Sequence, residues 1–125
     1  MNKEELKERT KKFALRVSKL TDVLPKISKG YTVSNQLNRS ATSVASNYRA
    51  ACRSKSKLEF ISKLGQVEEE TDESAFWLEI IIESNLMKRE LVENLLHEAY
   101  EILAIIVSSK LTAQRNCPEF QKRKI

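Results

Sequence analysis

Basic side chains dominate a long stretch of the sequence that contains no acidic residue. The acid-free run extends from residue 23 to residue 58, and its cations are Lys26, Lys29, Arg39, Arg49, Arg53, Lys55 and Lys57. Arginine and lysine side chains are common ligands of nucleic-acid phosphates. The run therefore indicates either a surface for a polyanion or one half of a charge pattern that the rest of the fold neutralises.

The spacing of these residues favours one face of a helix over about residues 32–53. At about 100° per residue, six polar side chains of this segment fall within an arc of about 80°. They are Asn35, Arg39, Thr42, Ser46, Arg49 and Arg53. The arc lies nearly opposite the apolar stripe of Leu37, Val44 and Tyr48, so the face can follow phosphate oxygens without reading bases. Two structural interpretations stay open: a solvated face, and arginines that pair with the acidic segment that follows.

Acidic side chains crowd residues 66–87, where no basic residue occurs. They are Glu68, Glu69, Glu70, Asp72, Glu73, Glu79 and Glu83. A bundle that holds two metals needs glutamates aimed at its core and a Glu-x-x-His step on two helices. The only histidine, His97, has Asn94 three positions before it, so that step is missing. We predict no metal site, and we expect Glu68, near the core stripe, to pair with an arginine from another helix.

Other catalytic groups are scarce. A chain with two glycines has no glycine-rich phosphate loop. A nucleophile needs a base and an orienting group, and one histidine is little support for that arrangement. Cys52 and Cys117 lack metal-ligand spacing, and we expect both to be reduced. The chain is therefore predicted to be no enzyme and to need no cofactor.

A second apolar face is predicted in the segment SAFWLEIIIES, residues 74–84. Ala75, Leu78 and Ile82 continue a core stripe at helical spacing. Four further apolar residues are assigned to other sides of the helix, and Ile105 is expected to join them. The predicted interface consists of Phe76, Trp77, Ile80, Ile81 and Ile105. Such a surface favours self-association; an apolar patch on a monomer is the alternative.

Helical spacing recurs along the whole chain of 125 residues, which has two glycines and two prolines. The predicted helices cover about residues 3–23, 32–53, 57–84 and 88–114. Leu15 and Leu91 are among the apolar positions assigned to the first and fourth. Pro25 ends the first helix, Ser56 and Glu59 form a capping box before the third, and Asn85 suits a left-handed C-terminal residue after it.

Four amphipathic helices with short links predict an all-α fold, an antiparallel up-down-up-down four-helix bundle. One domain is expected over residues 1–116, with a flexible basic tail over 117–125. The N-terminus has no apolar h-region, and no apolar run approaches a membrane span. A cytoplasmic protein without a membrane partner is expected.

The stretch NQLNRSATSVASNYRAACRSKSKLEFISKLGQVEEETDESAFWLEIIIES, residues 35–84, resembles the central motif of a known family. Its members are encoded in intervening sequences of bacterial 23S ribosomal RNA genes, and FALRVSKLTDVLP, residues 13–25, is similar too. The resemblance implies an antiparallel four-helix bundle that assembles into a homopentamer. Most members have no determined function; a related accessory protein of diversity-generating retroelements is a basic pentamer that engages a reverse transcriptase and nucleic acid.

Two functions follow as hypotheses. The first is a non-enzymatic oligomer that binds structured RNA or another nucleic acid weakly through the basic face. Its predicted contacts are Arg39, Arg49, Arg53, Lys55 and Lys57. The second is a protein-interaction scaffold that makes no contact with nucleic acid and uses its basic and acidic faces for assembly or for a protein partner.

Overall fold

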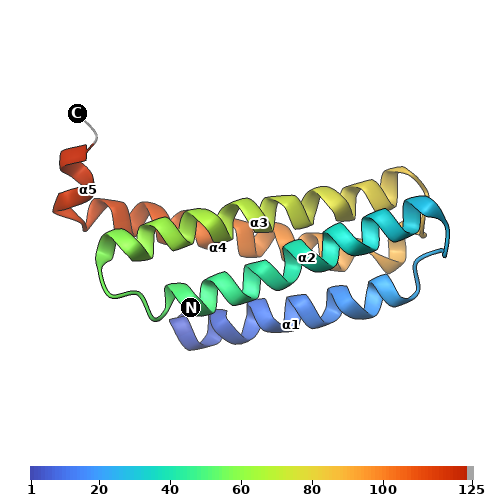
Figure 1. The fold of residues 1–125 in the computed structure, drawn as a ribbon, viewed down its shortest axis with the longest axis horizontal. Helices are drawn as coiled ribbons and strands as arrows, with labels where there is room; N and C mark the ends of the chain where they lie inside the picture. Colours follow the sequence, from blue (N-terminus) through green and yellow to red (C-terminus); the bar gives the residue numbers. More distant parts are fainter. Residues whose placement is uncertain (124–125) are drawn as a thin grey trace.

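The computed structural model describes residues 1–123 and is helical throughout apart from short links. Its elements are α1 (Lys3–Asp22), α2 (Ser28–Ala51), α3 (Lys57–Glu83), the short 3-10 helix η1 (Arg89–Leu91), α4 (Glu93–Arg115) and α5 (Pro118–Arg123). The four long helices run in alternating directions along a common axis (Figure 1). The all-α prediction is confirmed, with four long helices. None of the helices in the described chain is long and apolar enough to cross a membrane.

The predicted helix boundaries around α3 are confirmed by their hydrogen bonds. Ser56 Oγ accepts from the Glu59 amide at 3.1 Å, while the Glu59 carboxylate accepts from the Lys55 amide at 3.0 Å. Ser56 is the N-cap residue of α3, so the Glu59 carboxylate binds the amide of the residue before the N-cap. At the other end Asn85 has φ 58°, and the Leu86 amide donates to the Ile81 carbonyl at 3.0 Å. This is a Schellman motif, which satisfies carbonyls at the end of a helix.

Two predicted helix starts need correction. The second helix begins at Ser28 instead of about residue 32, because Gly30 fits closely against the Pro25 carbonyl. The fourth helix begins at Glu93 and follows η1, so the chain turns differently at residues 88–92. In consequence Leu91, assigned to the core, is 63% exposed, whereas Val92, which the sequence also assigns to the core, is buried. Leu15, another assigned apolar position, is also exposed.

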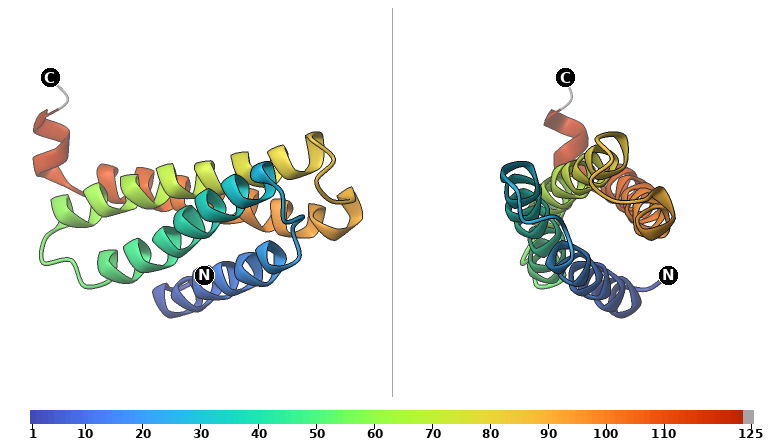
Figure 2. Two further views of the ribbon diagram at one scale, coloured as in Figure 1. Left: turned by 45° about the vertical axis from the view of Figure 1, so that its right-hand side comes forward. Right: turned by 90° about the vertical axis from the view of Figure 1, so that its right-hand side faces the viewer.

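The helices share one hydrophobic core. Its largest fully buried side chains are Phe13, Leu37, Leu64, Leu78, Ile81, Ile102 and Ile106, with Val17, Val33, Val44, Val67 and Val92. Viewed end-on, the helices form an arc with α1 and α4 at its two ends (Figure 2). Arg9 of α1 links these two ends of the arc, because its guanidinium donates to both carboxylate oxygens of Glu98 of α4 at 2.7 Å. The α1–α4 contact is the least extensive among neighbouring long helices.

The last described residues form α5, which follows the buried Cys117. The Gln121 side chain donates to the Gln114 carbonyl of α4 at 2.8 Å. Two residues of the expected basic tail, 124 and 125, lie outside the described part of the chain. The flexibility expected of residues 117–125 stays a prediction.

Candidate nucleic-acid interface

The polar face of α2 is exposed along its length. The five arc side chains on α2 are accessible to solvent, namely Asn35, Arg39, Thr42, Ser46 and Arg49, and so is Arg53, which lies just past the end of the helix. Leu37, Val44 and Tyr48, on the opposite side, are buried in the core. The wheel therefore predicts the orientation of α2 correctly. Its basic side chains nevertheless have different surroundings.

Arg39 is bound by the acidic helix. Its Nη1 donates to Glu70 Oε2 at 3.2 Å, and its Nη2 forms an ion pair with Glu73. The hydrogen bond to Glu73 is the main reason why the pKa of the Arg39 guanidinium is raised above its ordinary value. Two carboxylates thus compensate the charge of Arg39 and occupy its Nη1 and Nη2 donors. Arg39 is therefore a poor ligand for a phosphate.

Arg49 lies on a groove between α1 and α2. Small side chains of both helices, together with charged ones, line this cleft of about 500 Å³. The lining residues are Glu4, Lys7, Glu8, Lys11, Ala14, Thr42, Ala45, Ser46 and Arg49. Lys7 is paired with Glu4 at 3.1 Å, whereas Arg49 makes no ion pair within residues 1–123. Arg49 therefore keeps its charge available at the surface.

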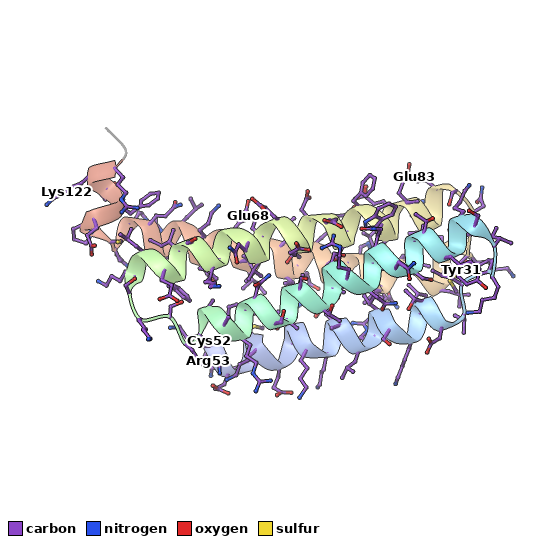
Figure 3. The ribbon with its side chains drawn as sticks, viewed as in Figure 1. Tyr31, Cys52, Arg53, Glu68, Glu83 and Lys122 are labelled. Atoms are coloured by element: carbon purple, nitrogen blue, oxygen red, sulfur yellow. The ribbon has the colours of Figure 1, made fainter. Side chains whose placement is uncertain are left out.

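The remaining predicted cations lie where α2 is linked to α3. Arg53, Lys55 and Lys57 are all exposed, and Figure 3 shows Arg53 beside Cys52 at the end of the bundle away from Tyr31 and Glu83. Lys57 Nζ donates to the Asn116 carbonyl at 3.1 Å. In the described chain, neither Arg53 nor Lys55 forms an ion pair.

A lysine of α1 adds to this end of the molecule. Lys3 Nζ lies 4.6 Å from the centre of the Phe60 ring, and both residues border the link between α2 and α3. Sequence reasoning missed Lys3, Lys7 and Lys11 as neighbours of the α2 cations. A wheel drawn for one helix gives no information on which side chains the adjacent helix presents.

Several acidic side chains of α3 make ion pairs or hydrogen bonds. Glu68 pairs with Lys110 of α4 at 2.5 Å, so its partner is a lysine and the arginine expected from the sequence is wrong. Figure 3 shows Glu68 about midway along α3. Tyr100 donates to Glu79 Oε2 at 2.5 Å. Across residues 1–123, no three His, Cys, Asp or Glu side chains come together as a metal-binding group.

The five residues of the predicted oligomer interface do not form one surface. Phe76 is 49% exposed and packs edge-on against Trp77. Trp77, Ile80 and Ile105 are partly buried against the core, and Ile105 lines a hollow with Leu6 and Phe60. Ile81 is fully buried in the core, which corrects its assignment to another side of α3. Phe76 with the accessible parts of Trp77 and Ile80 is what remains of the patch.

Comparison with known proteins places the chain in a family. The model of the 23S rRNA-intervening sequence protein family matches residues 2–108. The chain belongs to this family. It is also similar to a crystal structure from Bacteroides thetaiotaomicron, described as a protein with unknown function from the S23 ribosomal protein family. That match has 31% identity and a TM-score of 0.81, and covers 88% of this chain and 98% of the other. None of the curated proteins matches.

Proposed function

We propose that this member of the 23S rRNA-intervening sequence protein family is a non-enzymatic, cytoplasmic oligomer that binds structured RNA at one end of its bundle. The contacts are made by the basic end, which we define as Arg49, Arg53, Lys55 and Lys57. One observation carries the proposal: the side chains of Arg49, Arg53 and Lys55 have no carboxylate partner in the described chain, whereas that of Arg39 has two. Uncompensated cations at one end of a molecule attract a polyanion.

The chemistry of the basic end favours phosphates over bases. Its side chains are long, exposed and carried partly by the link between two helices, so they can follow a backbone of varying shape. Contacts of this kind hold a nucleic acid without reading its sequence. Each subunit contributes few contacts, and an oligomer raises the total affinity by presenting several copies.

The test is a charge reversal at the basic end. Arg49→Glu with Arg53→Glu is expected to lower the affinity for a structured RNA by about 10-fold or more at low salt, since two phosphate contacts are lost. Arg16→Glu with Arg89→Glu is the matched control, because it changes net charge equally at exposed arginines outside the basic end. Affinity is measured by fluorescence anisotropy and folding by circular dichroism. Equal losses in the two folded variants contradict a localised site.

A protein-interaction scaffold is the second candidate. The observation that favours it is the exposure of two aromatic side chains, Phe76 on α3 and Tyr100 on α4. Exposed aromatic residues are enriched at protein interfaces. Affinity capture from the native host separates the candidates: a partner protein that survives nuclease treatment supports the scaffold, and loss of the captured material on nuclease treatment supports RNA binding.

A further inference from the structure

A small hollow lies at the corner where α2 is linked to α3. Its volume is about 360 Å³. The residues that line it are Lys3, Ala51, Cys52, Ser54, Lys55, Ser56, Lys57 and Phe60. Three of the eight are lysines and none is acidic, so the hollow differs from the α1–α2 groove, where Glu4 and Glu8 stand among the cations. This corner is a concave site with charge of one sign.

The lysines retain capacity to bind a ligand. Lys57 uses one of its three ammonium hydrogens on the Asn116 carbonyl, and Lys55 makes no side-chain hydrogen bond in the described chain. Lys3 stands over the Phe60 ring, which holds its ammonium group at the rim. Two acidic residues adjoin the lining in the sequence, Glu4 beside Lys3 and Glu59 beside Phe60. Glu4 pairs with Lys7, the Glu59 carboxylate accepts from the Lys55 amide, and neither residue lines the hollow.

One lining residue, Ser54, has a buried hydroxyl group without a partner. Ser54 Oγ has almost no accessible surface and forms no hydrogen bond within residues 1–123. A buried polar atom of this kind calls for a ligand or an ordered water. The hollow also lies at the start of the 27-residue helix α3, where free amides and the helix dipole favour an anion.

We infer that this corner hollow binds a phosphoryl group. A phosphate monoester carries about −1.5 to −2 charges at pH 7 and presents three acceptor oxygens, which suits the three lysines of the lining. An internal phosphodiester carries one negative charge and offers fewer free oxygens. The inference deepens the proposed function, on which it rests for the source of the group: the terminal phosphate of a nucleic-acid strand.

The hollow itself is tested with inorganic phosphate and the full chain. Amide NMR spectra are compared in phosphate and in chloride at constant ionic strength. Saturable shifts are expected at residues 54–58, and Lys3→Gln with Lys55→Gln should abolish them. Lys12→Gln with Lys29→Gln, which removes two exposed lysines away from the hollow, should leave them unchanged. Absent shifts, or shifts that survive in the first variant, overturn the inference; the same spectra report whether each variant is folded.

The source of the phosphoryl group is tested with one RNA that ends in either a 5′-phosphate or a 5′-hydroxyl. The phosphorylated form should bind about 5-fold more tightly, and the Lys3→Gln, Lys55→Gln variant should lose that difference. Equal binding of both forms together with intact phosphate shifts supports the hollow as a site for a free or internal phosphate. RNA binding without phosphate shifts overturns the hollow alone, whereas phosphate shifts without RNA binding overturn the proposed function alone.

Discussion

Arg39, Arg49 and Arg53 have the same side chain on the same predicted arc, and their neighbours give them different roles. Arg39 lies beside Glu70 and Glu73 of α3, whereas Arg49 lies in the last turn of α2 and Arg53 in the link that follows it. The sequence predicts the shared face because helical periodicity is local. It cannot predict the pairing, because that depends on how α2 and α3 are aligned along their axes over a separation of about 30 residues.

Tyr100 provides a test at the scale of one hydrogen bond. Its bond to Glu79 is the main reason why the pKa of Tyr100 rises to about 12; burial and the negative charges of Glu79, Glu83 and Asp72 act in the same direction. In the unfolded chain the pKa is about 10. A raised folded pKa gives a stabilising contribution that is complete below about pH 10 and is lost as the pH rises through about 12.

Tyr100→Phe should therefore lower the free energy of unfolding by about 0.5 kcal/mol below pH 10, a small value because the side chain is 42% exposed. The difference from the wild type should shrink between about pH 10 and pH 12. Urea unfolding across this range measures it. A difference that is constant with pH, or that grows, would contradict the assigned hydrogen bond.

At the scale of elements, the signals that the sequence predicts correctly involve short-range chemistry. The Ser56 cap, the left-handed Asn85 and the end of α1 before Pro25 all depend on residues within a few positions of one another. The wrong helix starts depend on contacts that local patterns do not reveal. Gly30 favours a loop by propensity, yet the packing of the first α2 turn against Pro25 makes it helical.

The two glycines give an element-scale prediction with a built-in control. A Cβ atom at Gly30 would lie 1.9 Å from the Pro25 carbonyl oxygen, while one at Gly65 would meet nothing within 4 Å. Gly65→Ala should raise the free energy of unfolding by about 0.5–1 kcal/mol, since alanine is the better helix former. Gly30→Ala should lower it, because the backbone must move. Chemical denaturation of both variants decides, and a stabilised Gly30→Ala protein would refute the close contact.

At the scale of the whole molecule, charge is distributed unevenly. Residues 31–65 carry a net charge of +5 and residues 66–87 one of −7. The ion pairs of α3 with Arg39 and Lys110 use part of the acidic charge inside one subunit. The cations of the basic end form no ion pairs in the described chain, and their charge supports an electrostatic function at that end.

Self-association is predicted through the exposed part of the α3 patch. Phe76→Glu places a charge beside Trp77 and should convert the expected oligomer into monomers, since a buried unpaired charge is costly. Leu15→Glu is the control, because Leu15 is an exposed apolar side chain on α1. Light scattering at micromolar concentration gives the mass of each variant. A Phe76→Glu protein of unchanged mass, or a monomeric wild type, contradicts this interface.

RNA binding at the basic end is tested most directly by its salt dependence, measured with the purified, nuclease-treated protein. Four phosphate contacts per site predict that affinity falls by about 50- to 150-fold between about 50 and 200 mM salt, because each contact contributes a slope of about −0.7 to −0.9. A fall of this size, with the slope reduced by about two in the Arg49→Glu, Arg53→Glu variant, is the expected result. Absence of binding at about 50 mM salt, or binding that salt does not weaken, would contradict a phosphate-binding basic end.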